Sequence, residues 1–175
     1  MNNLKSYLKP VLVLAVICLV TSGILAVTNQ KTAPIIEAAA NAKVEQVRKE
    51  VLPQADGFEQ LNVDGLPSTV TGVYKASNDA GYVFMLTTKG YGGEMQLICG
   101  MDADGKITAC DTLSQQETQG LGSKTTLPKF RDQFKGKDSS LEGVDTISGA
   151  TISSTAYIKA IKDAFTAYGL AKEAA

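Results

Sequence analysis

The sequence predicts an α+β protein: a small antiparallel sheet with flanking helices, preceded by one N-terminal transmembrane helix. Three observations predict this class. Val11–Val27 is an uncharged, mostly aliphatic run near the N-terminus. Between residues 69 and 112, short segments rich in β-branched and aromatic residues alternate with turn residues. Towards the C-terminus, apolar residues recur with a helical period.

The apolar run predicts a membrane anchor. Lys5 and Lys9 precede it and Lys31 follows it, so the positive-inside rule places the N-terminus in the cytoplasm and residues 30–175 outside. A secretory signal peptide shares the basic start and the apolar core. However, no A-x-A cleavage site follows, and the run outlasts the usual apolar core of a signal peptide. We therefore expect residues 1–29 to form a tail and an uncleaved anchor.

A second helix is expected between the anchor and the sheet. In Pro34–Leu52 apolar residues recur with a helical period opposite a charged face, and Pro53 ends the pattern. Residues 30–55 thus predict a membrane-proximal helix that packs against the rest of the protein. Residues 56–175 form the remaining domain, which opens with loop-like sequence as far as Ser68.

Four strands are expected to form the sheet. Turn residues separate them, notably Asn78-Asp79-Ala80-Gly81 and Asp104-Gly105. The predicted strands are Thr69–Ala76, Gly81–Lys89, Glu94–Met101 and Lys106–Thr112.

The last predicted hairpin carries two cysteines. A two-residue Asp104-Gly105 turn would place Cys99 and Cys110 directly opposite each other, whereas a three-residue loop with a glycine bulge would place them on opposite faces. Neither register favours a disulfide. Free thiols in packing roles are therefore expected.

Two helices are expected after the sheet. Thr126–Phe134 suits a short helix with Thr126 as its cap and Pro128 in its first turn. The C-terminal helix is expected to run from about Ser154 to Ala171. Its predicted buried stripe consists of Tyr157, Ile158, Ile161, Ala164, Phe165 and Tyr168.

Composition excludes several classes of function. The chain has no histidine, which removes histidine-based acid–base catalysis and histidine-ligated zinc or haem. Its three cysteines form no CxxC pair and cannot ligate an iron–sulfur cluster alone. No metal site and no catalytic residue are expected. With a net charge of −1 and no strongly basic stretch, nucleic acid is not expected as a partner. Redox work by this chain would need an organic cofactor.

The most specific segment is Asp145–Ser154, which reads DTISGATISS. Ser148 and Thr151 flank Gly149-Ala150, and an apolar-periodic helix follows. A helix N-terminus offers unpaired N–H groups and a partial positive charge, so it holds a phosphate well. The same residues also suit an ordinary Ser/Thr helix cap after a glycine turn.

The residues from Asp145 to Thr151 resemble the signature of proteins that carry FMN on a threonine through a phosphoester bond made by a dedicated flavin transferase. The run Glu117–Lys124, ETQGLGSK, is similar to the ETPGLG loop of FMN-binding subunits in bacterial respiratory complexes, with Gln119 in place of proline. Residues 90–93 add Gly-Tyr-Gly-Gly. Together with the single apolar segment and the chain length, these motifs make the chain similar to the G subunits of Rnf complexes, the ion-translocating ferredoxin:NAD oxidoreductases. The C subunit of the sodium-pumping NADH:quinone reductase is a weaker match because it is a longer chain.

The resemblance implies that residues 56–175 are an FMN-binding domain and that Thr151 carries the flavin. Asp145 would serve recognition by the transferase or metal-assisted activation of the threonine hydroxyl, with a turn cap as the alternative. Backbone N–H groups of the 117–123 loop would face the isoalloxazine ring and Leu121 would pack on it, while Glu117 has a purely structural role as its alternative. The further residues expected at the flavin are Ser148, Gly149, Ala150, Ser153 and Ser154 near the phosphate, and Thr118, Gly120, Gly122 and Ser123 near the ring.

The function implied by the resemblance is electron relay within a membrane-bound oxidoreductase complex. The implied partners are multi-span membrane subunits, a second covalent-FMN subunit, cytoplasmic iron–sulfur and flavin subunits, the flavin transferase during maturation, and membrane lipid. Covalent attachment suits a carrier outside the cell, where a dissociated flavin would be lost. The alternatives are the equivalent subunit of a sodium-pumping NADH:quinone reductase, and a flavin-free, membrane-anchored assembly module.

Overall fold

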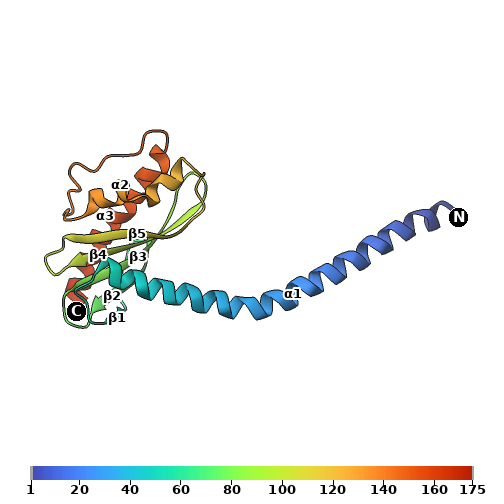
Figure 1. Ribbon diagram of the computed structural model, residues 1–175, viewed down its shortest axis with the longest axis horizontal. Coiled ribbons are helices and arrows are strands. Elements are labelled where there is room, and N and C mark those ends of the chain that lie inside the picture. Colours follow the sequence, from blue (N-terminus) through green and yellow to red (C-terminus); the bar gives the residue numbers. More distant parts are fainter. Residues whose placement is uncertain (1, 175) are drawn as a thin grey trace. The chain divides into compact units, whose positions relative to one another are not determined.

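The computed structural model describes the backbone of residues 2–174 and the side chains of residues 8–36 and 38–174. The chain forms two compact units, Met1–Lys43 and Val44–Ala175. The second unit contains all the strands and all the helices that follow them (Figure 1).

A single long helix makes up the first unit and continues into the second. α1 runs over Asn2–Val51 with Pro10 and Pro34 inside it, although the sequence predicts two separate helices. The connection between the predicted helices contains no glycine, and the hydroxyls of Thr28 and Thr32 donate to carbonyls one turn earlier. Pro34 removes one backbone hydrogen bond without ending the helix.

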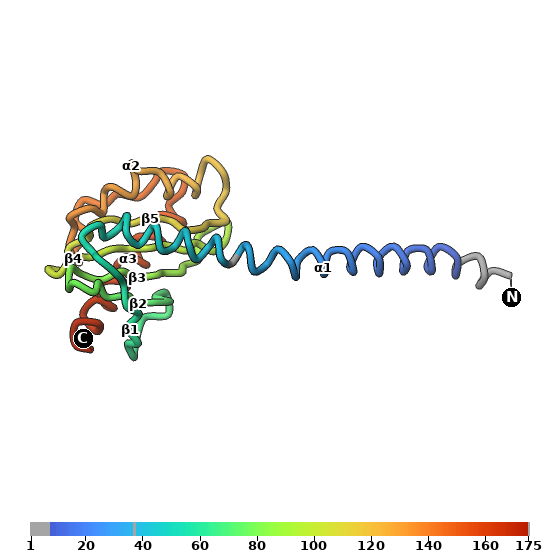
Figure 2. The backbone as a smooth tube through the Cα atoms, turned by 60° about the horizontal axis from the view of Figure 1, so that its bottom comes forward, coloured from blue at the N-terminus to red at the C-terminus, as the bar shows by residue number. Residues whose placement is uncertain are grey.

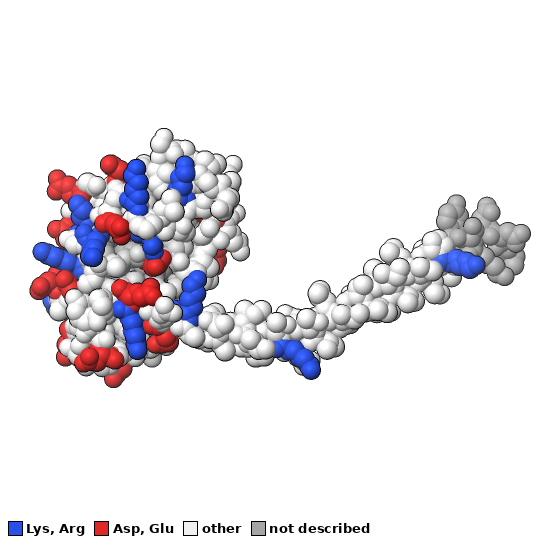
Figure 3. All heavy atoms as spheres, viewed as in Figure 1, with Lys and Arg blue, Asp and Glu red and all other residues white. Residues whose placement is uncertain are grey.

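The apolar part of α1 has the length and composition needed to cross a membrane. The span from Leu8 to Val51 contains a window with a mean hydropathy of 2.7, and the described side chains of residues 8–36 are exposed. Figure 3 shows few charged side chains along this helix and many on the second unit. The helix is thus a candidate membrane span, as the run Val11–Val27 predicts.

The second unit is built on a five-stranded antiparallel sheet whose spatial order equals its order in the sequence. Figure 2 shows the chain passing from each strand to its neighbour. The strands are β1 (Phe58–Leu61), β2 (Val70–Ala76), β3 (Gly81–Lys89), β4 (Glu94–Asp102) and β5 (Ile107–Gln115). The four predicted strands are confirmed with small differences at their ends. β1 is an addition, since it lies in the segment expected to be a loop and pairs with β2.

The β4–β5 turn is the three-residue loop, but the two cysteines pair as expected for the two-residue turn. The Asp102 N–H donates to the Lys106 carbonyl at 2.9 Å across a three-residue loop in which Gly105 has a φ of 78°. A register shift at the end of β4 then brings Cys99 directly opposite Cys110. Their sulfur atoms are 3.3 Å apart, and both are buried free thiols.

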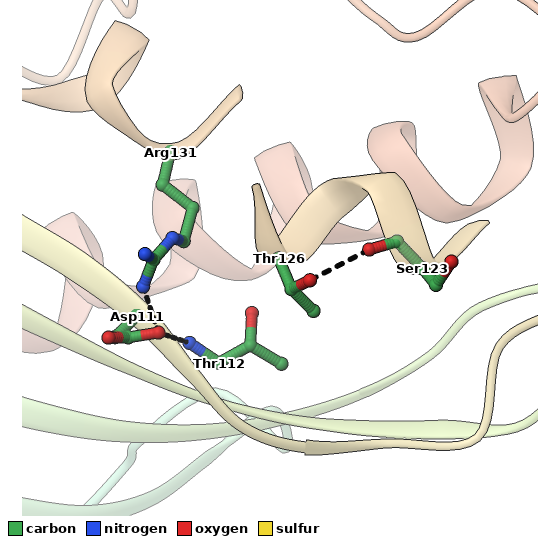
Figure 4. A network of polar contacts seen from close by, with 5 residues as sticks. All are labelled: Asp111, Thr112, Ser123, Thr126 and Arg131. Atoms are coloured by element: carbon green, nitrogen blue, oxygen red, sulfur yellow. Dashed lines mark hydrogen bonds and ion pairs between the residues drawn. The ribbon is translucent and has the colours of Figure 1, made fainter. Parts of the chain in front are cut away.

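The segment after the sheet contains three short helices instead of one. They are the 3₁₀ helix η1 (Gly122–Thr126), α2 (Pro128–Arg131) and the 3₁₀ helix η2 (Asp132–Phe134). Thr126 does not cap α2 as predicted, because its hydroxyl donates to the Ser123 carbonyl at 2.8 Å within η1 (Figure 4). Leu127 precedes Pro128 without a side-chain cap. Arg131 forms an ion pair with Asp111 of β5, which holds α2 over the sheet.

The C-terminal helix α3 covers Thr151–Ala174 and begins three residues earlier than predicted. It starts at Thr151 because Gly149, with a φ of 79°, turns the chain immediately before it. The Ser154 hydroxyl donates to the Ala150 carbonyl at 2.9 Å and accepts from the Ile147 N–H at 3.2 Å. These bonds fix the first turn of α3 onto the loop that leads into it.

Apolar side chains fill both faces of the sheet. On one face, Phe84 packs with Phe130 and Phe134 of the short helices and with Tyr157 and Ile161 of α3. On the other face, the end of α1 packs against the sheet, because successive residues of a strand point to opposite sides. That second cluster consists of Val47, Val51, Leu52, Ala76, Val83 and Ile98. The Arg48 guanidinium lies 3.5 Å from the centre of the Tyr74 ring and holds the end of α1 in place.

Candidate flavin site at the start of α3

Thr151 is the first residue of α3 and its side chain is exposed. The preceding Ala150 is buried, and its N–H donates to the Ile147 carbonyl at 2.9 Å. The first N–H groups of a helix have no partner within the helix and carry a partial positive charge. The Thr151 hydroxyl therefore stands beside donors suited to a phosphate.

A cavity of about 430 Å³ opens around Thr151. Three segments that are distant in the sequence form its wall: the turn between β3 and β4, the loop after β5, and the first turn of α3. The lining residues are Tyr91, Glu117, Thr118, Leu121, Gly122, Gly149, Ala150, Thr151, Ile152 and Ser153. The cavity falls within the range typical of small-molecule sites. None of the lining residues is a lysine or an arginine, so a phosphate here would depend on the N-terminus of α3.

Glu117 joins the three segments of the wall. Its Oε2 accepts the Ser153 hydroxyl of α3 at 2.7 Å, and its two carboxylate oxygens accept the Gly92 N–H at 3.3 and 3.2 Å. The side chain is buried, with 9% of the residue exposed. A Cβ atom added at Gly90 would lie 1.9 Å from Oε1, and one added at Gly122 would lie 2.1 Å from Oε2. Glycine at these two positions therefore makes room for the carboxylate.

The loop after β5 uses its N–H groups differently from the prediction. The Leu121 and Ser123 N–H groups both donate to the Thr118 carbonyl, at 3.1 and 3.3 Å. The Gly120 N–H donates to the Ser123 hydroxyl at 2.8 Å. These three donors close the loop on itself and do not face the cavity. The loop presents the side chain of Leu121, which is 47% exposed.

Several predicted site residues lie away from the Thr151 cavity. Gly120 and Ser123 line a separate shallow hollow. Ser154 is fully buried, and its hydroxyl bonds the backbone of the preceding turn. Asp145 and Ser148 line a neighbouring cavity of about 670 Å³. Its other lining residues are Lys124, Leu127, Lys129, Phe130, Gln133, Thr146 and Ile147.

Tyr91 and Ile152 are lining residues to which the sequence assigned no role. Their exposed fractions are 73% and 60%. With Leu121 they give the cavity an apolar rim, which is the surface that a flat aromatic ring system requires. The run Gly-Tyr-Gly-Gly at residues 90–93 could have indicated a role for Tyr91. A tyrosine between glycines in a tight turn is not buried in the core, so its side chain is free to line a binding site.

Apolar walls, a helix N-terminus and an exposed hydroxyl together fit a phosphate-bearing aromatic cofactor. Residues 90–166, which include all the residues that line the Thr151 cavity, match the FMN-binding domain family, and residues 1–51 match the RnfG N-terminal region. Fold and site thus define an FMN-binding domain that follows an N-terminal helix. The chain is 34% identical to the G subunit of the ion-translocating oxidoreductase complex of Methanosarcina acetivorans, over 94% of this chain and 95% of that protein. It belongs to the family of these G subunits, which confirms the resemblance drawn from the motifs.

A second relative agrees with this assignment. The G subunit of the Na⁺-translocating ferredoxin:NAD⁺ oxidoreductase complex of Acetobacterium woodii is 34% identical over 86% of this chain and 79% of that protein. Among solved structures, the C subunit of the Na⁺-translocating NADH-quinone reductase of Parabacteroides distasonis aligns with a TM-score of 0.47 and 27% identity. That alignment covers 57% of this chain and 60% of that one.

Proposed function

We propose that this chain is the electron-transfer subunit of an Rnf-type ferredoxin:NAD oxidoreductase complex and carries FMN as a phosphoester on Thr151. The observation that carries the proposal is the position of the Thr151 hydroxyl. It is exposed, it stands at the N-terminus of α3, and it lies in the wall of a cavity with an apolar rim. The residues that line this cavity fall within the region that matches the FMN-binding domain family, which supports the proposal.

Each part of the site has a role in this proposal. Thr151 supplies the ester oxygen, so that the chain gains FMN and loses one water. The first N–H groups of α3 stabilise the negative charge of the phosphodiester. Tyr91, Leu121 and Ile152 exclude water from the ring and hold it in place. The bound flavin supplies the electron-accepting and electron-donating chemistry, and no side chain of this chain has to act as an acid, a base or a nucleophile during turnover.

The proposal includes a topology. The N-terminus lies in the cytoplasm and the flavin domain lies on the outer side of the membrane, because lysines precede the apolar run and uncharged Thr28-Asn29-Gln30 follow it. Electrons that start in the cytoplasm must then cross the bilayer through partner subunits to reach this flavin. A single helix without an acidic residue between Leu8 and Gln30 anchors the domain, so ion passage belongs to the multi-span partners.

Mass spectrometry tests the attachment site. The chain, purified from cells that contain the flavin transferase, should carry FMN minus water on the peptide that includes Thr151. Thr151→Ala and Thr151→Val should remove this mass because neither variant keeps the hydroxyl. Ser148→Ala, which alters the neighbouring cavity, is the control for attachment at Thr151 and should retain the mass. A flavin found on Ser148 or Ser153 would contradict the assignment, and a colourless wild-type chain would favour the flavin-free assembly module.

Protease accessibility tests the topology. In intact spheroplasts, added protease should digest the flavin domain without lysis, and the domain should co-purify with multi-span membrane subunits when the membrane is solubilised. Digestion only after lysis would place the flavin in the cytoplasm and refute a relay across the membrane.

A further inference from the structure

Glu117 is a buried acid in the wall of the Thr151 cavity. Both of its oxygens accept hydrogen bonds, from the Ser153 hydroxyl and from the Gly92 N–H, which is how an ionised carboxylate bonds. None of the ion pairs among the described residues includes Glu117. Its donors are a hydroxyl and a backbone amide, which carry no net charge.

No lysine or arginine in the walls of the cavity neutralises this carboxylate. The remaining lining residues are uncharged, and Leu121 and Ile152 are apolar. The interaction of a charge with a group inside such a cavity is weakly screened compared with the same charge on the surface. The glycines at positions 90 and 122 leave room for the carboxylate, because a side chain at either position would collide with it.

We infer that Glu117 is a positioning residue that also sets the reduction potential of the flavin. This inference rests on the proposed function, since it requires the flavin on Thr151. Reduction adds negative charge to the ring system, and a fixed carboxylate in the same cavity opposes that addition. Glu117 therefore lowers the reduction potential of the bound flavin and makes it a stronger electron donor.

The direction of the change in reduction potential distinguishes an effect of the Glu117 charge from an effect of its packing. Glu117→Gln keeps the size of the side chain and removes the charge, so the potential should rise. The expected change is on the order of tenfold in the equilibrium constant for one-electron reduction, or about 59 mV. Glu117→Asp keeps the charge and shortens the side chain, so it should weaken the bonds to Ser153 and Gly92 and should not raise the potential.

The matched control is Glu94→Gln. Glu94 begins β4 in the hairpin that carries Gly92, and it also bears one negative charge, but it is exposed. Because water and salt screen an exposed charge, this variant should leave the potential unchanged. Should Glu117→Gln fail to fold, Ser153→Ala gives an independent measurement. This variant removes the hydroxyl that donates to Oε2, so the negative charge of the carboxylate is less offset. The reduction potential of the flavin should therefore fall.

The experiment is spectroelectrochemical titration of the flavin in the purified full-length chain, after mass spectrometry has shown that each variant carries it. A rise for Glu117→Gln, with no change for Glu94→Gln and no rise for Glu117→Asp, supports the inference. Equal potentials for the wild type and Glu117→Gln would overturn it, as would an equal rise for Glu94→Gln. Absence of flavin from the wild-type chain would instead refute the proposed function.

In flavin-free Thr151→Ala protein, adding Glu117→Gln should lower the melting temperature, because Gly92 and Ser153 lose a charged acceptor.

Discussion

The hydroxyl residues around Thr151 differ in what surrounds them. Ser153 is buried and bonds Glu117, Ser154 is buried and bonds the preceding turn, and Ser148 opens into the neighbouring cavity. Thr151 alone among these four is both exposed and in the wall of the apolar cavity. The sequence motif presents all four as candidates because it does not record which way each side chain faces. Their different surroundings follow from the one turn at Gly149 that starts the helix.

The two buried cysteines should be unreactive in the folded protein. Cys99 is fully buried and Cys110 is 6% exposed. Burial, followed by the hydrogen bond to Cys99, raises the pKa of the Cys110 thiol well above its ordinary value of 9.0, and the reactive form of cysteine is the thiolate. An alkylating agent should not label Cys99 or Cys110 in folded, detergent-solubilised protein and should label both after denaturation without reductant. Two thiols that stay blocked after denaturation would reveal a disulfide and contradict the prediction.

High pH should destabilise the second unit. Burial raises the pKa of Tyr157 well above 10.0, as it raises that of Cys110. The unfolded chain loses these protons at a lower pH than the folded chain, so the free energy of unfolding is at its full value below about pH 9 and falls as the pH rises further. Each group contributes a loss of about 1.4 kcal/mol per pH unit above its unfolded pKa. Urea denaturation at pH 7 and pH 11 measures this difference.

Tyr157→Phe isolates the contribution of the tyrosine. The Tyr157 hydroxyl is buried and makes no hydrogen bond of normal geometry among the described residues, while the nearby Thr112 hydroxyl lowers its pKa against the larger effect of burial. Its removal should therefore change the stability at pH 7 by no more than about 1 kcal/mol. The same variant should reduce the loss at pH 11. Tyr91→Phe removes an exposed hydroxyl and serves as the control. An alkaline loss that is the same in the wild type and Tyr157→Phe would exclude Tyr157 as its cause.

At the scale of elements, the loop after β5 depends on glycines for two different reasons. A Cβ atom at Gly122 would lie 2.1 Å from the Glu117 carboxylate and 2.8 Å from the Ser153 hydroxyl, so Gly122→Ala should destabilise the unit by about 1–3 kcal/mol. Gly120 has open space around it but a φ of 77°, so Gly120→Ala should cost about 1 kcal/mol of backbone strain. Gly169→Ala, on the exposed side of α3, should stabilise by about 1 kcal/mol. Denaturant titration of the three variants measures their free energies of unfolding; no loss for Gly122→Ala, or a loss for Gly169→Ala, would contradict the prediction.

The elements that the sequence predicts well are those defined by local patterns. The strands β2 to β5 follow from alternating apolar residues between turn residues, and α3 follows from its apolar stripe. β1 was missed because its four residues form a strand only by pairing with β2. The start of α3 and the division of Thr126–Phe134 into short helices depend on individual hydrogen bonds, such as that from Thr126 to Ser123. Such bonds leave no periodic signal in the sequence.

At the scale of the whole molecule, the site could be predicted only in part. The motifs identify the loop after β5 and the start of α3, because each is a continuous run of residues. The turn between β3 and β4 is distant from these runs in the sequence and lines the same cavity only in the folded protein. Glu117 connects this turn to α3 through its hydrogen bonds with Gly92 and Ser153. The contribution of Tyr91 and the position of Ser148 in a second cavity therefore required the three-dimensional arrangement.

The boundary of the second unit can be tested by truncation. The compact unit starts at Val44, whereas the sequence suggests a domain from residue 56. A chain that starts at residue 56 lacks Val47, Val51 and Leu52, which are 7%, 2% and 0% exposed. At about 2 kcal/mol for each buried side chain, it should lose roughly 6 kcal/mol relative to residues 44–175. Thermal unfolding of the two fragments measures this; equal melting temperatures would show that the end of α1 does not contribute to the core.

The order of the elements along the chain also bears on when FMN could be attached at Thr151 under the proposed function. Each strand pairs with the one made just before it, so the sheet can assemble while the ribosome is still extending the nascent polypeptide. Thr151 belongs to the last element to emerge, and a polypeptide interrupted before it would have no acceptor hydroxyl. In the proposed function, attachment would therefore follow nearly complete synthesis, and only finished copies would acquire colour.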